Sequence, residues 1–143
     1  MADVLTMENI AINLPAEGRE DVIKRAGKML VDGGYAGERY IEGMLKRDET
    51  LSCAIGNLIA IPHGEKEYRS DIIKTGIVVI TYKEPVEWRG QQVRFVVGIA
   101  AKGEEHMDIL SNIVDKLETD EDVVNLVNKA DKKAIFDILN GGS

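Results

Sequence analysis

The sequence predicts an α/β fold in which helices cover both faces of a β-sheet, a three-layer sandwich. Two observations carry this prediction. Residues 77–80 and 93–101 are apolar runs without polar alternation, which is typical of strands that are buried on both faces. Segments with helical periodicity stand before, between and after the predicted strands.

The first third of the chain predicts a strand and two helices. Residues 10–14 form a short apolar stretch that Pro15 ends. Residues 19–30 fit a helix that Gly33 and Gly34 terminate, and its apolar face consists of Ile23, Ala26, Gly27 and Leu30. Residues 38–47 fit a second helix, whose apolar stripe consists of Ile41, Met44 and Leu45.

The middle of the chain predicts the sheet and the end predicts helices. Residues 53–61 are weakly strand-like and are cut by Pro62, and the two strong strands at 77–80 and 93–101 follow. Residues 106–117 fit a helix with an inward face of Leu110, Ile113, Val114 and Leu117. Two short helices are expected at 122–128 and 132–139.

The chain has 143 residues, which is the size of one domain. We expect residues 1–140 to form this domain and residues 141–143 to be a tail.

Composition excludes several classes of protein. No apolar run approaches the roughly 20 residues that span a bilayer, and the N-terminus lacks signal-peptide features. A single cysteine also favours a cytoplasmic protein. The net charge of −7 disfavours nucleic acid and suits a protein partner with a basic face.

One candidate functional residue is His63, in the motif IAIPHG at residues 59–64. Pro62 cannot extend a strand ladder, and Gly64 leaves room for another molecule to approach the imidazole. This is how a nucleophile is presented at the end of a strand. A loop histidine without a role is the alternative interpretation.

The second histidine, His106, follows the strand at 93–101 and opens the helix at 106–117. Both histidines therefore follow strands, and if those strands are parallel, both side chains lie at one edge of the sheet. Open α/β sheets place their sites at such an edge. The alternative for His106 is a half-buried histidine with satisfied hydrogen bonds.

Several chemistries fit this pair poorly. A metal site needs three or four ligands, and Cys53, Glu65 and Glu104 lack ligand spacing. A Cys-His hydrolase needs an exposed cysteine, whereas Cys53 lies among apolar and small residues. The sequence has no nucleophile elbow, P-loop or dinucleotide fingerprint. Covalent phosphorylation of a histidine fits what remains, because a neutral imidazole nitrogen can accept a phosphoryl group and pass it on.

The chain resembles the enzyme IIA domains of the bacterial sugar phosphotransferase system of the mannitol/fructose type, most of all the mannitol-specific ones. The resemblance spans nearly the whole chain, with its motifs in the family's order. These motifs are ENI at 8–10, GGY at 33–35, Met44-Leu45 with Arg47, IAIPHG at 59–64, VGIAA at 97–101 and EH at 105–106.

The resemblance implies a phosphotransferase of sugar transport, a cytoplasmic phosphoprotein that needs no cofactor or metal. His63 would accept a phosphoryl group on Nε2 from the phosphocarrier protein HPr. It would pass the group to a cysteine of the enzyme IIB component of a membrane permease, which phosphorylates mannitol or a related sugar on uptake. His106 and Arg47 correspond to the family's other active-site residues. The family fold, a mixed sheet flanked by helices, together with the strand pattern predicts a mixed, mostly parallel sheet.

Two positions depart from the family pattern. Glu65 stands where a small or hydroxyl residue often follows His-Gly, and Asn57 stands where some members are acidic. We expect Glu65 to be solvated, or paired with Lys66, Arg69 or HPr, because the consecutive charges at residues 65–67 are typical of an exposed surface segment.

The alternative function is a regulatory module of the same fold that binds partners according to its phosphorylation state. A third interpretation is an interaction domain with incidental histidines.

Overall fold

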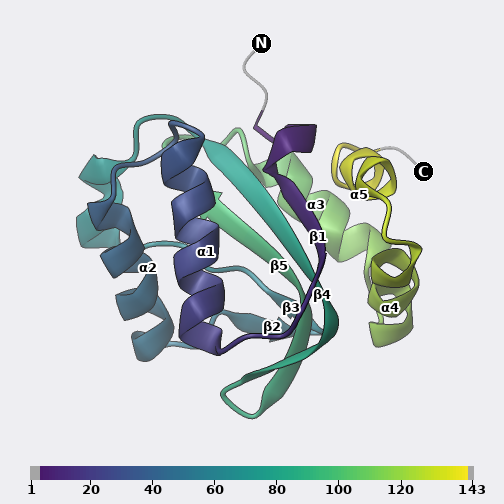
Figure 1. The fold of residues 1–143 in the computed structure, drawn as a ribbon. Helices are drawn as coiled ribbons and strands as arrows, with labels where there is room; N and C mark the ends of the chain where they lie inside the picture. Colours follow the sequence, from purple (N-terminus) through teal and green to yellow (C-terminus); the bar gives the residue numbers. More distant parts are fainter. Residues whose placement is uncertain (1–3, 142–143) are drawn as a thin grey trace.

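The computed structural model describes residues 4–141, so residues 142–143 of the expected tail lie outside the described part of the chain. The elements in chain order are η1 (Met7–Asn9), β1 (Ile10–Leu14), α1 (Arg19–Asp32), α2 (Arg39–Thr50), β2 (Ala54–Gly56), β3 (Ile59–Ala60), η2 (Lys66–Asp71), β4 (Gly76–Trp88), β5 (Gln91–Ala100), α3 (Met107–Lys116), α4 (Asp120–Lys129) and α5 (Lys132–Leu139). Helices α1 and α2 cover one face of the sheet, and α3, α4 and α5 cover the other (Figure 1). The predicted three-layer α/β sandwich is therefore confirmed.

The five strands form one mixed sheet in the order β1-β4-β5-β3-β2. Strand β1 pairs with β4 and β3 pairs with β5 in parallel, whereas β4 with β5 and β2 with β3 are antiparallel. A mixed sheet was predicted and is found, although half of its pairings, rather than most, are parallel. The antiparallel pairs are hairpins, because two-residue turns at Asn57-Leu58 and Arg89-Gly90 have positive φ at both residues.

These hairpins account for two differences from the predicted strands. The single strand expected at 53–61 is divided by the turn at Asn57 and Leu58 into β2 and β3. The strand expected at 77–80 continues to Trp88, so that β4 and β5 form a long hairpin. The other predicted strands and helices are present, with ends shifted by at most three residues.

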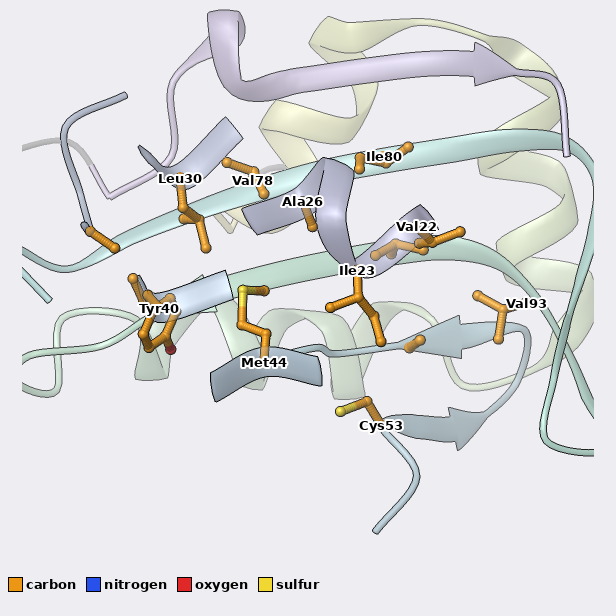
Figure 2. Packing of buried hydrophobic residues seen from close by; sticks show 14 of the residues in the cluster. Val22, Ile23, Ala26, Leu30, Tyr40, Met44, Cys53, Val78, Ile80 and Val93 are labelled. Atoms are coloured by element: carbon orange, nitrogen blue, oxygen red, sulfur yellow. The ribbon is translucent and has the colours of Figure 1, made fainter. Parts of the chain in front are cut away.

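Two hydrophobic layers lie on opposite faces of the sheet, because side chains alternate along β4. Val78 and Ile80 face α1 and α2, and Figure 2 shows them in the layer that contains Ile23 and Met44. Ile77 and Val79 face the other layer, formed with α3, α4 and α5. The strands are thus buried on both faces, as their uninterrupted apolar runs predict.

The buried faces of two helices differ from the predicted ones. In α3, Ile109 and Ile113 are buried and Leu117 is buried just after its end, but Leu110 is only partly buried and Val114 is 67% exposed. In α2, Met44 is buried as expected, whereas Ile41 and Leu45 are only partly buried. The fully packed stripe of α2 is instead Tyr40, Met44 and Asp48, which places a carboxylate against the core. Among residues 4–141, no helix has the length and apolar character needed to cross a membrane.

Candidate active site

A cavity of about 630 Å³ at one edge of the sheet brings the predicted site residues together. His63, His106 and Arg47 all line it, although they are far apart in the sequence. His63 follows β3, His106 follows β5, and Arg47 lies in the last turn of α2. Because β3 and β5 are parallel neighbours, the loops that leave them meet at the same edge. The parallel arrangement assumed for these two strands is therefore correct.

The backbone around His63 continues the sheet beyond β3. His63 forms a parallel bridge with Ile99, and the N–H of Ile99 donates to the carbonyl oxygen of Pro62 at 3.0 Å. The Nδ1 atom of His63 lies 2.9 Å from the carbonyl oxygen of Ile61. A carbonyl only accepts, so Nδ1 carries a proton, and in the neutral form of the ring Nε2 then has the free lone pair.

His106 stands at the N-cap position of α3, where its side chain makes no capping hydrogen bond, and it is partly buried. Burial lowers the pKa of its imidazole and the neighbouring His63 adds to this, while Glu105 and Glu104 act in the opposite direction. The ring is therefore neutral at pH 7, and one of its nitrogens can donate a hydrogen bond. Its Nδ1 atom is buried and has no hydrogen-bond partner within residues 4–141.

Arg47 is partly buried at the C-terminal end of α2. One guanidinium nitrogen, Nη1, donates to the carbonyl oxygen of Leu51 at 2.7 Å. A cation at this end of a helix is favourable, since the last carbonyls carry partial negative charge. A guanidinium has five N–H donors, so this contact leaves capacity for an anion in the cavity.

Cys53 also lines the cavity, but its chemistry is that of a small buried side chain. It is 3% exposed, and burial together with the nearby Asp48 raises the pKa of its thiol to about 11. The thiol is thus protonated at neutral pH and is a poor nucleophile. This agrees with the interpretation of Cys53 as a small hydrophobic residue rather than half of a Cys-His pair.

The sequence did not reveal the importance of Asp48, which is fully buried. Its carboxylate accepts hydrogen bonds from Arg19 at 2.6 Å, Arg89 at 3.0 Å, the Trp88 indole at 2.9 Å and the Cys53 backbone N–H at 2.9 Å. Burial alone would raise the pKa of this carboxyl group, but the four donors outweigh it and lower the pKa. Asp48 therefore ties α1, the β4–β5 hairpin and the segment before His63 to α2. The sequence feature that could have indicated a buried Asp48 is its position eight residues after Tyr40, on the same face of the helix.

The two departures from the family pattern have different surroundings. Glu65 is partly buried and lines the cavity, and its Oε1 atom accepts from the Thr50 hydroxyl at 2.9 Å. The expected ion pair with Lys66 or Arg69 is not found within residues 4–141, whereas the side chain is still partly exposed to solvent, in line with the expectation of a solvated carboxylate. Asn57 lies in the β2–β3 turn and donates to the Glu118 carbonyl at 2.8 Å. Asn57 is not among the residues that line this cavity.

Exposed apolar side chains lie at and beside the cavity, whose lining also includes the charged and exposed Lys66 and Arg69. Ile55 is 56% exposed and lines the cavity. Leu51, Ile73 and Met107 are also exposed, and each is adjacent in sequence to a lining residue. Within residues 4–141, no three His, Cys, Asp or Glu side chains are grouped as metal ligands. A lone-pair nitrogen, a second imidazole and a guanidinium, with exposed apolar side chains nearby, suit group transfer between docked proteins.

The chain is similar to known proteins over nearly its whole length. Residues 3–142 match the family model described as phosphoenolpyruvate-dependent sugar phosphotransferase system, EIIA 2. The chain is 41% identical over 138 residues to the mannitol-specific phosphotransferase enzyme IIA component of Bacillus subtilis, covering 96% of each chain.

Solved structures are similar as well. The crystal structure of IIA mannitol from Escherichia coli has a TM-score of 0.82 and 31% identity, covering 94% of this chain and 97% of the other. The IIAMTL chain from the same organism, solved in complex with phosphorylated enzyme IIBMTL, has a TM-score of 0.84 at 31% identity, covering 94% and 95%.

Proposed function

The chain belongs to the EIIA 2 family of the phosphoenolpyruvate-dependent sugar phosphotransferase system, and from that premise we propose that it carries a phosphoryl group on Nε2 of His63. The group would come from phospho-HPr and pass to a cysteine of an enzyme IIB component. The observation that carries the proposal is the contact between His63 Nδ1 and the Ile61 carbonyl, in a cavity shared with His106 and Arg47. It supports an imidazole held with Nε2 free to attack phosphorus.

The transfer consists of two in-line displacements. In the first, the Nε2 lone pair of His63 attacks phosphorus, and the bond to the donor phosphoprotein breaks with its electron pair leaving on the donor. In the second, a cysteine thiolate of the acceptor attacks phosphorus and the bond to Nε2 breaks. The proton on Nδ1 stays where the Ile61 carbonyl holds it. The phosphoryl oxygens carry the charge, so donors around them lower the barrier.

We assign His106 and Arg47 to this charge stabilisation. The neutral His106 ring offers one N–H, and the Arg47 guanidinium offers a fixed fork of donors that matches phosphoryl geometry. Both line the cavity with His63, which supports the assignment. Glu65 lines the same cavity, and its contact with Thr50 holds one of its oxygens.

The exposed apolar side chains near the cavity and the net charge of −7 support docking of partners that combine an apolar patch with basic residues. The mannitol-specific relatives support mannitol or a related sugar as the substrate of the permease served. We propose that residues 1–140 act as one domain in the cytoplasm, where both protein partners are accessible.

The direct experiment mixes the protein with HPr that carries labelled phosphate and then adds a mannitol-type enzyme IIB. We expect label on His63, followed by its appearance on the enzyme IIB cysteine. No label on the wild-type protein would overturn the proposal. Label that reached His63 but never passed to enzyme IIB would favour the regulatory alternative. Transfer from HPr should also weaken as salt rises, since steering between charged proteins is screened.

A further inference from the structure

The loop that presents His63 is held by hydrogen bonds on both sides of the histidine. Before it, the Pro62 carbonyl accepts from the Ile99 N–H at 3.0 Å. After it, the Glu65 N–H donates to the Gly43 carbonyl at 3.1 Å, and the Gly64 N–H donates to the hydroxyl of Tyr40 at 2.9 Å. The contact to Gly64, the residue next to His63, is thus made by a side chain from α2.

The Tyr40 hydroxyl also binds the other side of the loop. It donates to the carbonyl oxygen of Ile99 at 2.8 Å while it accepts from Gly64. Ile99 is the residue of β5 that bridges to His63. One oxygen atom therefore links β5 to the peptide that follows His63, and both of its hydrogen-bonding roles are occupied by main-chain groups.

The ring of Tyr40 fits against Gly64 without spare room. A Cβ atom added to Gly64 would lie 2.4 Å from the Cε1 atom of Tyr40, a distance that would force the ring to move. Tyr40 is 3% exposed and lies beside Met44 in the layer shown in Figure 2. The glycine of the His-Gly motif is thus required here by the packing of Tyr40, and the ring cannot swing away without disturbing the core.

These contacts determine the position of the reactive nitrogen. The direction of Nε2 depends on the backbone of His63 and on the Nδ1 contact with Ile61. Tyr40 fixes the peptide after His63 relative to β5, although it touches no reacting atom. Misplacement of a reacting group by about 1 Å can reduce a rate by about 100-fold.

We propose that Tyr40 is a positioning residue for phosphoryl transfer at His63, acting through the main chain of Gly64. The proposal rests on the proposed function and adds a residue to it. Burial raises the pKa of the Tyr40 phenol, so the hydroxyl keeps the proton it donates to Ile99 at neutral pH. Loss of that hydroxyl leaves the Gly64 N–H and the Ile99 carbonyl without this partner and loosens the loop around His63.

The test compares Tyr40→Phe with Tyr82→Phe. Tyr82 is also a buried tyrosine, but its hydroxyl donates to Glu17, which does not line the cavity. We expect Tyr40→Phe to lower the single-turnover rate of transfer from phospho-HPr by about 10- to 100-fold at saturating donor, with little change in half-saturation. Tyr82→Phe should lower the melting temperature and leave the transfer rate of the folded protein unchanged.

The second readout is the imidazole nitrogen NMR signals of His63. In the wild type they should show Nδ1 protonated, whereas in Tyr40→Phe they should move toward a mixture of tautomers. In Tyr82→Phe they should match the wild type. A Tyr40→Phe protein with the wild-type rate would overturn the proposal, as would unchanged His63 signals or a rate loss explained fully by the unfolded fraction.

Gly64→Ala keeps the proposal testable if Tyr40→Phe folds poorly. The added Cβ forces the Tyr40 ring to move, so this variant should also slow transfer and shift the His63 nitrogen signals. A folded Gly64→Ala protein with the wild-type rate would overturn the proposal. The carrier function and the role of Tyr40 can be refuted separately. Absence of label on wild-type His63 refutes the carrier function, whereas a normal rate in Tyr40→Phe refutes only the role of Tyr40.

Discussion

The Nδ1 atom of His63 lies 2.9 Å from the carbonyl oxygen of Ile61, two residues earlier in the chain. This local contact selects one of the two neutral tautomers, because a carbonyl oxygen can only accept. Pro62 stands between the two residues, and its own carbonyl accepts from Ile99. The strand-Pro-His-Gly motif thus determines both the chemical form of the imidazole and its orientation.

We predict that His63 is the only covalent site. His63→Gln should fold, because His63 is not part of the buried core, and it should take up no phosphoryl group from phospho-HPr. Mass spectrometry of the intact protein measures the uptake. A label that persisted on His63→Gln would refute the assignment of His63 as the acceptor.

His106→Ala should slow transfer and leave His63 as the labelled residue. Loss of one preorganised donor typically raises a barrier by about 2.7–4 kcal/mol, which is about 10²–10³ in rate. Rapid-quench measurements with labelled HPr give the rate. Transfer to enzyme IIB at the wild-type rate would mean that His106 is structural only.

The Arg47→Gln variant tests whether the Arg47 guanidinium stabilises the transferring phosphoryl group or is only a solvated charge. We expect transfer to slow by about 10²–10³ and stability to fall by about 1 kcal/mol, since a single bond to the Leu51 carbonyl is lost. Arg94→Gln is the matched control. Arg94 also donates to main-chain carbonyls, those of Tyr82 and Lys83, but it does not line the cavity. Equal rates in the two variants would contradict the role of Arg47.

Asp48→Asn should destabilise the fold by about 3–5 kcal/mol, because it breaks a buried charge pair and leaves arginines without their carboxylate. Urea denaturation measures this loss. Asp32→Asn is the control, since Asp32 is exposed and its pair with Lys28 contributes about 0–1 kcal/mol. Equal losses in the two variants would contradict the importance of the buried network.

The same residue predicts a dependence on pH. The pKa of Asp48 is lowered in the folded state, so the unfolded chain binds this proton more readily. Its stabilising contribution is therefore complete above the ordinary value of about 3.9 and is lost as the pH falls through the lower folded pKa. The wild type should approach the stability of Asp48→Asn only in that acid range.

The sequence predicted the layers of this fold because burial leaves a pattern along the chain. The strands at 77–80 and 93–101 are covered on both faces, so apolar side chains occupy consecutive positions in them. Such a run can be recognised from the sequence alone. The hairpin turns were missed because Asn57-Leu58 lies inside an apolar run and Leu58 is an unusual residue at positive φ. Val114 was misplaced because apolar residues occur on more than one face of α3.

The candidate site was predictable to the extent that its residues follow strands. His63 and His106 follow neighbouring parallel strands, and strand ends can be identified from the sequence. Tyr40 and Asp48 could not be identified in this way, because their roles depend on partners far away in the chain. Tyr40 bonds to Ile99, 59 residues later, and Asp48 bonds to Arg89, 41 residues later. Contacts between residues so far apart in the chain leave no short-range pattern in the sequence.

The contact between Glu65 and Thr50 leads to a prediction about the lifetime of the phosphorylated protein. A carboxylate close to phospho-His63 would repel the phosphoryl oxygens and hasten hydrolysis. The Thr50 hydroxyl lies 2.9 Å from Oε1 of Glu65 and 3.2 Å from the Lys46 carbonyl, so its one proton is shared between two acceptors. We expect this contact to restrain the carboxylate and to reduce the repulsion in the wild type. Glu65→Thr should therefore change the hydrolysis half-life by less than about tenfold, or 1.4 kcal/mol.

Thr50→Val removes the restraint and leaves the carboxylate in place. The freed side chain still lines the cavity, so the half-life should shorten by a few-fold, and Glu65→Gln in the same background should restore it. Loss of labelled phosphate over time measures each half-life, with the melting temperature as a check on folding. Thr50→Val and the wild type with equal half-lives would show that this hydrogen bond does not restrain the charge. A much longer half-life in Glu65→Thr alone would show that the carboxylate already acts on the phosphoryl group in the wild type.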